Sequence, residues 1–312
     1  MKSKVLALCA VIILAGCLLL FTGCQPNYHT GGGVVGGTTA IQTTPRPPAH
    51  TTRATTPAAS PYYGNYGRSA VEGNSTAFSF KDVELSASNK IGWGLGSAVD
   101  SKNRPIDALS AQSKYGELGA VFINENTDNR IYLTFDEGYE NGHTPQILDA
   151  LGAKGVRATF FVTYDYCKNQ PELIQRMINE GHEVGNHSWS HPSFPDCNGD
   201  RVREEIMKLH DYVKEGFGYE MRLIRFPMGE FSEPVLTIAH ELGYKSVFWS
   251  FAYSDWEVGN QPSPEYAYQK IASATHPGAV ILLHAVSATN AEILPELLRF
   301  WLGNGLKPDL LP

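Results

Sequence analysis

Apolar runs of strand length alternate with amphipathic stretches of helix length from about residue 130 onward. This alternation is typical of a parallel sheet that is built from successive βα units. The predicted strands lie near residues 131–135, 157–163, 183–186, 222–225, 246–250 and 279–284, and a last short strand follows residue 305.

Two of the intervening helices have clear start and stop signals. One begins near Pro171 and ends at Gly181, and another lies between Ser232 and Gly243. Six or seven βα units are too many for a small open sheet and slightly few for an eight-fold barrel. We therefore predict an α/β fold in the form of an irregular (β/α) barrel, with residues 129–312 as its domain.

The preceding residues differ in composition from the barrel. Residues 70–128 contain aromatic and glycine-rich pieces such as "KIGWGLGSAVD", and we predict an N-terminal extension that wraps the barrel or caps its rim. Residues 25–69 are Thr, Pro, Gly and Ala with hardly a charge. Such a segment has too few large apolar groups to offset chain entropy, so we predict a disordered linker.

Residues 1–24 read as a lipoprotein-type signal peptide. Lys2 and Lys4 precede an apolar run over residues 5–21, and lipobox-like sites end at Cys17 and Cys24. We favour Cys24 as the lipidated residue, because cleavage at Cys17 would leave four apolar residues at the new terminus. We expect an extracytoplasmic protein attached through N-terminal lipid to the outer face of the bacterial cell membrane. An uncleaved signal anchor is the alternative.

Charge and cysteine content limit the partners. The formal net charge of −7 offers no basic patch for nucleic acid, so we expect no nucleic-acid partner. Of the five cysteines, Cys167 and Cys197 would remain in the folded part as a disulfide or as reduced buried thiols, and both readings stay open.

Ionisable residues stand at the ends of the predicted strands. The C-terminal ends of parallel strands converge on one mouth of a barrel, where active sites are built. Within a strand Asp136 and Glu137 would face opposite sides, but we expect the loop at Gly138 to let both turn toward the mouth. The full set that reaches the mouth is Asp136, Glu137, His187, His191, Arg225, Asp255 and His284.

These residue types permit metal-assisted hydrolysis. His187 and His191 in "HSWSH" can bind a divalent metal, zinc or a similar ion, with a carboxylate as third ligand. Asp136 suits a general base and His284 a general acid. The sequence has no phosphate loop and no G-x-S-x-G elbow. A glycosidase using Asp136 with Asp255 or Glu140 stays open, although it leaves the histidine pair unexplained.

At these residues the sequence resembles the polysaccharide deacetylases of the NodB-homology (carbohydrate esterase 4) family. The resemblance covers about residues 130–312 and implies the irregular (β/α)7-type barrel of the NodB deacetylase kind. Upstream "GWGLG" and downstream "LLHAVSATNAE" are similar to the branch of peptidoglycan, or muramic acid, de-N-acetylases that includes the δ-lactam-forming enzyme of spore cortex. Five motifs occur in family order: "TFDEGYENG", "HEVGNHSWSH", "RFPMGEFS", "SDWEVGN" and "ILLHAVS".

The resemblance implies a metal-dependent enzyme that removes N-acetyl groups from cell-wall peptidoglycan sugars, including N-acetylmuramic acid. It also assigns a role to each motif residue. Glu137 stands where the family has Asp, and Met228 stands where tyrosine or a basic residue is usual. The implied roles are base for Asp136, acid for His284, orienting groups for Arg225 and Asp255, metal ligands for Glu137, His187 and His191, oxyanion contact for the Met228 N–H, and acetyl pocket for Leu282.

Two alternatives to this function stay open. The same chemistry can act on chitin-like oligomers or acetylated xylan, because Trp93, Trp189 and Trp256 could stack on any sugar ring. Trp256 is the one that we assign to substrate binding. A non-catalytic glycan-binding protein on the same fold is the second alternative, but Asp136 and His284 are both intact. We expect a monomer that acts on an acetylated cell-wall glycan.

Overall fold

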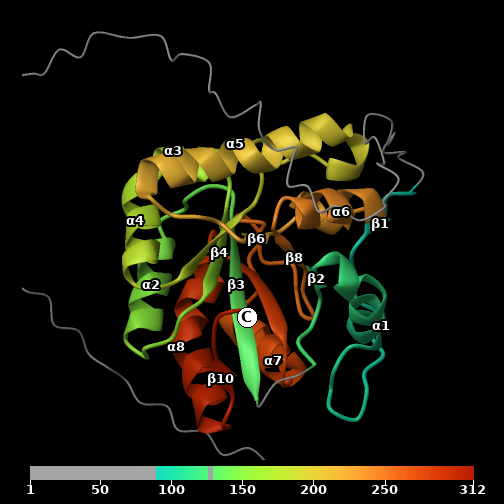
Figure 1. The fold of residues 1–312 in the computed structure, drawn as a ribbon. Helices are drawn as coiled ribbons and strands as arrows, with labels where there is room; N and C mark the ends of the chain where they lie inside the picture. The colour runs from blue at the N-terminus through green and yellow to red at the C-terminus, as the bar shows by residue number, and fades with distance from the viewer. Residues whose placement is uncertain (1–88, 126–128) are drawn as a thin grey trace, which may run out of the picture. The chain divides into compact units, whose positions relative to one another are not determined.

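A computed structural model describes residues 89–125 and 129–312. Parallel strands form a curled sheet, and helices pack around its outside (Figure 1). The predicted α/β fold, an irregular (β/α)7-type barrel, is confirmed.

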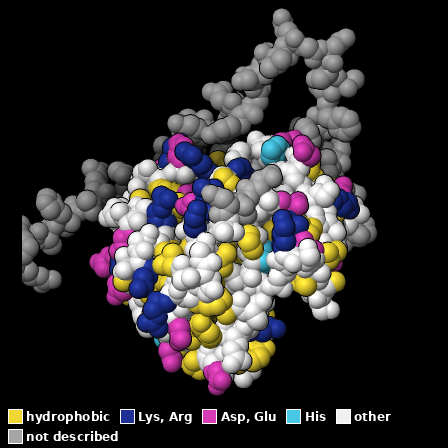
Figure 2. Space-filling model, turned by 90° about the horizontal axis from the view of Figure 1, so that it is seen from below, with side chains coloured by type: hydrophobic (Ala, Val, Ile, Leu, Met, Phe, Trp, Pro, Cys, Tyr) yellow, Lys and Arg dark blue, Asp and Glu magenta, His cyan; other side chains and the backbone are white. Residues whose placement is uncertain are grey.

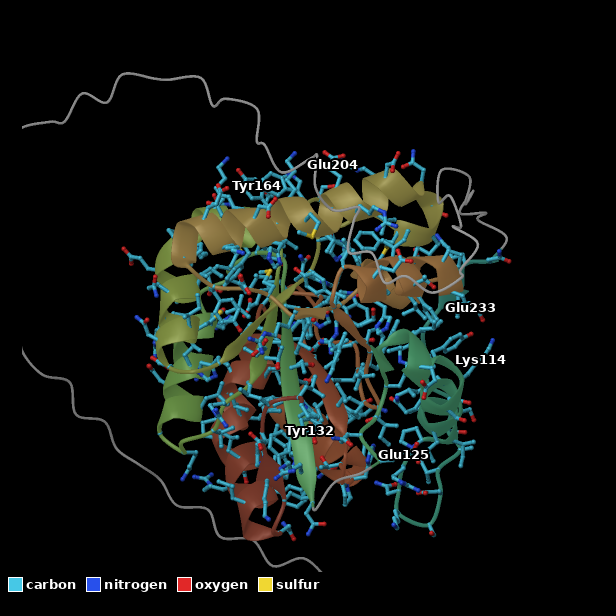
Figure 3. The ribbon with its side chains drawn as sticks, in the orientation of Figure 1. Lys114, Glu125, Tyr132, Tyr164, Glu204 and Glu233 are labelled. Atoms are coloured by element: carbon cyan, nitrogen blue, oxygen red, sulfur yellow. The ribbon has the colours of Figure 1, made fainter. Side chains whose placement is uncertain are left out.

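Seven strands make the barrel wall, and each is parallel to its neighbours. The chain places them in the order β9-β3-β4-β5-β6-β8-β2 across the sheet. Tyr132 lies on β3, in the interior of the molecule (Figure 3). Their bounds are β2 Ala120–Val121, β3 Arg130–Glu137, β4 Thr159–Val162, β5 Glu183–Asn186, β6 Leu223–Ile224, β8 Lys245–Val247 and β9 Val280–His284.

Backbone hydrogen bonds connect β9 and the residues just before it to the segments that follow β8 and β2. The Leu282 N–H donates to the Phe251 carbonyl beyond β8, and the Asn124 N–H donates to the Gly278 carbonyl before β9. Strand β10 (Lys307–Pro308) adds to the start of β3, as predicted after residue 305. All the predicted strands are therefore present, and strand β2 was not predicted.

The helices cover the outer face with their apolar sides. Helix α4 begins at Pro171. Ser232 caps the start of α6, because its side chain accepts a hydrogen bond from the Val235 N–H. Glu204 lies on the outer side of α5 (Figure 3). The bounds are α1 Ile106–Tyr115, α2 Thr144–Gly152, α3 Tyr164–Asn169, α4 Pro171–Asn179, α5 Gly199–Phe217, α6 Glu233–Glu241, α7 Pro264–Ala274 and α8 Ala288–Gly303.

The described part of the N-terminal extension is built into the barrel. Strand β2 pairs with β8, and helix α1 packs beside it. Strand β1 (Ile91–Gly92) pairs antiparallel with β7 (Glu230–Phe231), which follows β6 in the chain. The extension thus contributes a barrel strand as well as a rim contact, which is more than the predicted wrap or cap.

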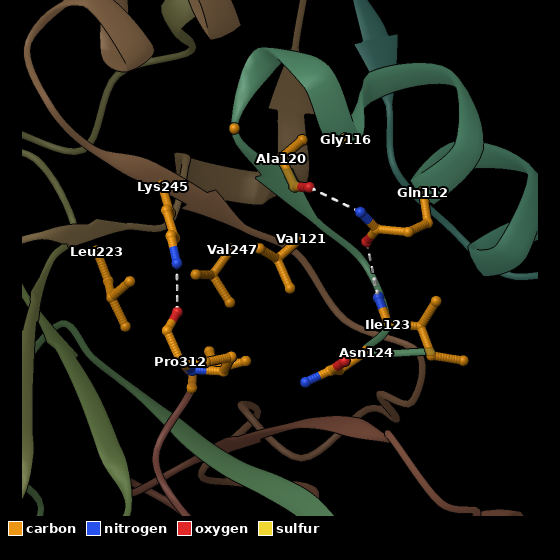
Figure 4. Close-up of a pocket in the computed structure, with 12 residues that line it drawn as sticks. Gln112, Gly116, Ala120, Val121, Ile123, Asn124, Leu223, Lys245, Val247 and Pro312 are labelled. Atoms are coloured by element: carbon orange, nitrogen blue, oxygen red, sulfur yellow. Dashed lines mark hydrogen bonds between the residues drawn. The ribbon is translucent and has the colours of Figure 1, made fainter. Parts of the chain in front are cut away.

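The end of the barrel opposite the strand tips is lined mainly by apolar residues. A small group that includes Tyr132, Phe161 and Val280 fills the interior. A pocket of about 210 Å³ opens below it, where Lys245 contacts the Pro312 backbone oxygen (Figure 4). This lower face mixes hydrophobic side chains with both signs of charge (Figure 2).

Several predictions concern residues that lie outside the described ranges. These are the signal peptide at 1–24 with Cys17 and Cys24, the linker at 25–69, and the extension up to residue 88. Within the described ranges, no helix combines the length and the apolar character needed to cross a membrane. Cys167 and Cys197 are both free thiols there.

Candidate active site

Asp136 lies at the mouth, on the inner face of strand β3, and is 6% exposed. Its Oδ1 accepts a hydrogen bond from Arg225 Nη1 at 2.8 Å, and its Oδ2 lies 3.6 Å from His187 Nε2. Burial opposes ionisation of this carboxyl, but the positive charge of Arg225, together with electrostatic interactions with His187 and His284, outweighs that cost. The pKa of Asp136 is therefore lowered, and the group is an ionised base at neutral pH.

Arg225 is 1% exposed, and each of its three guanidinium nitrogens donates a hydrogen bond. Besides Asp136 it donates to the carbonyls of Val247 and Phe248 at 3.1 Å each, and it lies 4.3 Å above the Phe161 ring. These contacts come from three different strands. The Asp136 carboxylate is thus held in one orientation by a buried charge pair with satisfied hydrogen bonds.

Glu137 does not join Asp136 in the mouth, contrary to our expectation. Strand β3 continues through both residues, with Asp136 opposite Phe161 and Glu137 opposite Val162 on β4. Because successive side chains of a strand alternate, the two carboxylates lie on opposite faces. The assumption that the strand ends before Glu137 was wrong.

The Glu137 carboxylate faces polar side chains behind the sheet. Its Oε1 lies 3.5 Å from Thr144 Oγ1, whose hydroxyl is 3.2 Å from the Tyr166 hydroxyl. Its Oε2 is buried with no hydrogen-bond partner. Burial first, and then the charges of Glu140 and Asp136, raise the pKa of Glu137 well above its usual value. This pocket favours the protonated carboxyl.

The two predicted metal-binding histidines do lie together. The ring centroids of His187 and His191 are 4.8 Å apart. The Nδ1 of His187 donates to the Arg225 carbonyl at 2.8 Å, which directs Nε2 toward Asp136. Burial first, and then the charge of His191, lower the pKa of His187 to about 4, so its ring is neutral and able to bind a metal.

The donor set only partly fits the predicted metal. Two neutral imidazoles suit zinc or a similar ion. The third predicted ligand, Glu137, points away from them, and among the described residues no three His, Cys, Asp or Glu side chains are grouped to hold an ion. The predicted three-ligand site is not assembled.

The loop that carries these histidines is rigidly held. Ser188 and His191 both have positive φ, at 71° and 57°. The Asn186 side chain accepts from the Ser188 N–H, and the buried Glu205 carboxylate of α5 accepts from Ser190. Side chains of this loop and of helix α5 therefore support a strained backbone at the site.

His284 ends strand β9 and pairs with Asp255, as predicted. The His284 Nδ1 lies 2.7 Å from Asp255 Oδ1, and the His284 N–H donates to Oδ2 at 2.8 Å. Burial alone lowers the pKa of His284, but the hydrogen bond and charge of Asp255 outweigh it. The pKa is raised above its ordinary value, which suits a general acid.

Two residues that orient this pair were missed in the sequence. Asn290 donates to Asp255 Oδ2 at 2.6 Å and to the His284 carbonyl at 3.2 Å, and the Tyr253 hydroxyl donates to Asn290. Asn290 lies in the quoted stretch "LLHAVSATNAE". A buried amide at the start of a helix that follows a catalytic strand end is the signal that could have identified it.

The predicted substrate contacts lie around the mouth. Leu282 is 5% exposed and lies on the same face of β9 as His284, while Met228 is 56% exposed with φ of 59°. Trp256 is 50% exposed, with its ring 5.7 Å from that of His284. Their predicted roles fit these places.

The other two tryptophans are half-buried, and their rings pack against neighbouring side chains. Trp93 packs against Phe122 at 4.5 Å between ring centroids. Trp189 is stacked on Tyr164 at 3.6 Å, and Lys208 Nζ lies 4.4 Å from its ring centroid. Of the three, Trp256 is the most exposed and is the one best placed to stack on a sugar ring.

The mouth therefore holds a base with its buried cation, an acid with its buried carboxylate, and two imidazoles. Asp136 and His284 are directly opposite each other on the paired strands β3 and β9. An ionised carboxylate beside an imidazole whose pKa is raised, on adjacent strands at one mouth, can act as base and acid in the hydrolysis of an acyl bond.

Comparison with known proteins agrees with this chemistry. The sequence profile of a family described as polysaccharide deacetylase matches residues 123–247. The chain is 41% identical over 216 residues to the peptidoglycan-N-acetylmuramic acid deacetylase PdaA of Bacillus subtilis, which covers 69% of this chain and 81% of that protein. It is 43% identical to a 30.6 kDa protein of Geobacillus stearothermophilus, with 71% and 84% covered.

A solved structure has the same fold. The structure of Bacillus subtilis PdaA, a family 4 carbohydrate esterase, superposes with a TM-score of 0.67 and 39% sequence identity. The match covers 71% of this chain and 94% of that one.

Proposed function

This chain belongs to the polysaccharide deacetylase family, and on that premise we propose that it is a hydrolase that removes N-acetyl groups from the sugars of cell-wall peptidoglycan. The observation that carries the proposal is the Asp136–Arg225 pair directly opposite the His284–Asp255 pair. We propose N-acetylmuramic acid as the sugar, because the relative PdaA is named for it.

The residues divide the reaction between them. Asp136 takes a proton from the attacking water as the water's oxygen bonds to the acetyl carbon. The Met228 N–H donates to the resulting oxyanion, an interaction worth about 3–4 kcal/mol. His284 then gives its proton to the sugar nitrogen, the carbon–nitrogen bond breaks, and acetate and a free amine leave.

We also propose a divalent metal cofactor, zinc or a similar ion such as cobalt. The support is the pair of neutral imidazoles at the mouth. His187 and His191 are the proposed ligands. Glu137 is left out of this set because its carboxylate faces Thr144 on the other side of the sheet.

The test is acetate release from purified peptidoglycan, both intact and stripped of its peptides. We expect the purified protein to release acetate, to lose that activity after chelation, and to regain it with Zn²⁺ or Co²⁺. Metal content is the companion measurement. His191→Ala should lower it, and Glu137→Gln should leave it unchanged.

Each outcome bears on a different part of the proposal. Faster release from chitin oligomers or acetylated xylan would assign another polymer. Glycan binding without turnover, and unaffected by Asp136→Asn, would support a binding protein instead. Full activity in chelated protein free of metal would contradict the cofactor.

We further propose that the protein is a monomer held at the outer face of the cell membrane by lipid on Cys24. The support is the lipobox-like "FTGC" after an apolar run. In bacterial cells, Cys24→Ser should move the protein from the membrane fraction to the medium, with Cys17→Ser as the matched control. The reverse pattern would assign the lipid to Cys17.

A further inference from the structure

One lysine of the N-terminal extension connects two loops of the mouth. Lys90 Nζ lies 3.0 Å from Ser193 Oγ and 2.6 Å from Asp196 Oδ2, both just beyond His191 in the chain. The same ammonium lies 3.0 Å from Glu230 Oε2 on strand β7. A single cation thus bridges the histidine loop and the segment that follows Met228.

Three residues further on, Trp93 holds the same region through its backbone and its ring. The Trp93 N–H donates to the Gly229 carbonyl at 3.0 Å, and the indole Nε1–H donates to the Trp249 carbonyl at 3.0 Å. Between Lys90 and Trp93, strand β1 pairs with β7. Residues 90–93 therefore all contact residues 229–231, the segment that directly follows Met228.

The turn at Met228 needs external support. Met228 has φ of 59°, a conformation that costs free energy in a residue other than glycine. Gly229 follows with φ of 66°, and a Cβ there would lie 2.5 Å from the Trp249 ring. Within the turn the Gly229 N–H donates to the Phe226 carbonyl at 3.1 Å, and the Glu230 N–H donates to the Pro227 carbonyl.

We infer that Lys90 and Trp93 are positioning residues for catalysis, which hold the oxyanion turn at 226–230 and the histidine loop at 187–196 at a fixed separation. The inference rests on the proposed deacetylase function. It makes the described part of the extension a support of the active site, in which Lys90 and Trp93 act through the two loops and not on the substrate itself. An amide N–H stabilises an oxyanion only when it is held within hydrogen-bond reach, so displacement of the turn lowers kcat.

The test compares four forms of the full chain: wild type, Lys90→Met, Lys90→Arg and Lys102→Met. Lys102 is an exposed lysine of the same extension and serves as the matched control. We measure kcat and KM for acetate release, thermal unfolding, and amide hydrogen exchange over residues 187–196 and 226–231.

We expect Lys90→Met to lower kcat about tenfold while KM changes by less than about twofold. Amide exchange should rise in both segments and not elsewhere in the barrel. Lys90→Arg keeps a cation between the two carboxylates and should retain most of kcat. Lys102→Met should match wild type in every measurement.

Other results would overturn the inference. A kcat of Lys90→Met equal to that of Lys102→Met would do so, as would exchange that rises throughout the barrel. If Lys90→Met does not fold, Asp196→Asn and Glu230→Gln each remove one ion pair and keep the lysine. Unchanged kcat in both would reject the role.

The design separates this inference from the function on which it rests. If wild type and Lys102→Met release no acetate from any polymer, the proposed function fails. The exchange measurement then still reports whether Lys90 holds the two loops together.

Discussion

Replacing Asp136 with asparagine is expected to lower kcat for acetate release by about 10²- to 10⁴-fold, with little change in KM. The amide has nearly the same shape as the carboxylate, and its oxygen can still accept the hydrogen bond from Arg225 Nη1. It cannot take a proton from water. Steady-state acetate release on peptidoglycan, with thermal unfolding to show that the variant is folded, is the measurement.

The adjacent residue provides the control. Glu137→Gln replaces a buried carboxyl whose raised pKa already favours the neutral form, on the face of β3 away from the mouth. We expect this variant to keep most of its activity. An equal loss in Glu137→Gln and Asp136→Asn would mean that both carboxylates take part in the reaction, as the sequence first suggested.

The second large effect is on stability. Arg225→Met should lower the free energy of unfolding by about 3–5 kcal/mol, because it leaves the Asp136 carboxylate buried without its cation. Denaturant unfolding measures the change. Arg222→Met is the matched control, because Arg222 flanks the same strand, β6, and is exposed, and its effect should stay within about 0.5 kcal/mol.

Arg225→Met should also shift the pH dependence of activity in a defined direction. Arg225 helps to hold the pKa of Asp136 below its ordinary value, so this pair contributes stability above the unfolded-state pKa of Asp136. That contribution is lost as the pH falls through the lowered folded-state pKa. Without Arg225 the pKa of Asp136 rises, and the acid limb of the activity profile should move to higher pH. An unmoved acid limb would show that another group sets it.

The strand ends were predictable because they obey a simple rule. Long apolar runs identified β3 and β9, and parallel strands bring their C-terminal residues together. Asp136, His187, Arg225 and His284 could therefore be placed at one mouth without coordinates. The alternation of apolar and helical stretches likewise gave the number of βα units closely.

The missed features are short or depend on contacts between distant segments. Strands β1 and β2 have two residues each and lie before residue 130, where the alternation of apolar and amphipathic stretches begins. Asn290 contacts Asp255, which is 35 residues away in the chain. The error at Glu137 had a different cause, because it depended on whether β3 ends one residue earlier or later.

The proposed base and acid lie on the paired strands β3 and β9, whereas the exposed residues that can contact substrate lie on loops. Asp136 and His284 are partners in a ladder of backbone hydrogen bonds, so their spacing is fixed by the geometry of the sheet. The exposed Tyr139, Met228 and Trp256 instead stand on the loops that follow the strands. Loops tolerate substitution far better than paired strands do. Evolution of this protein toward another acetylated glycan can therefore proceed by changes at the rim while the distance between acid and base stays constant.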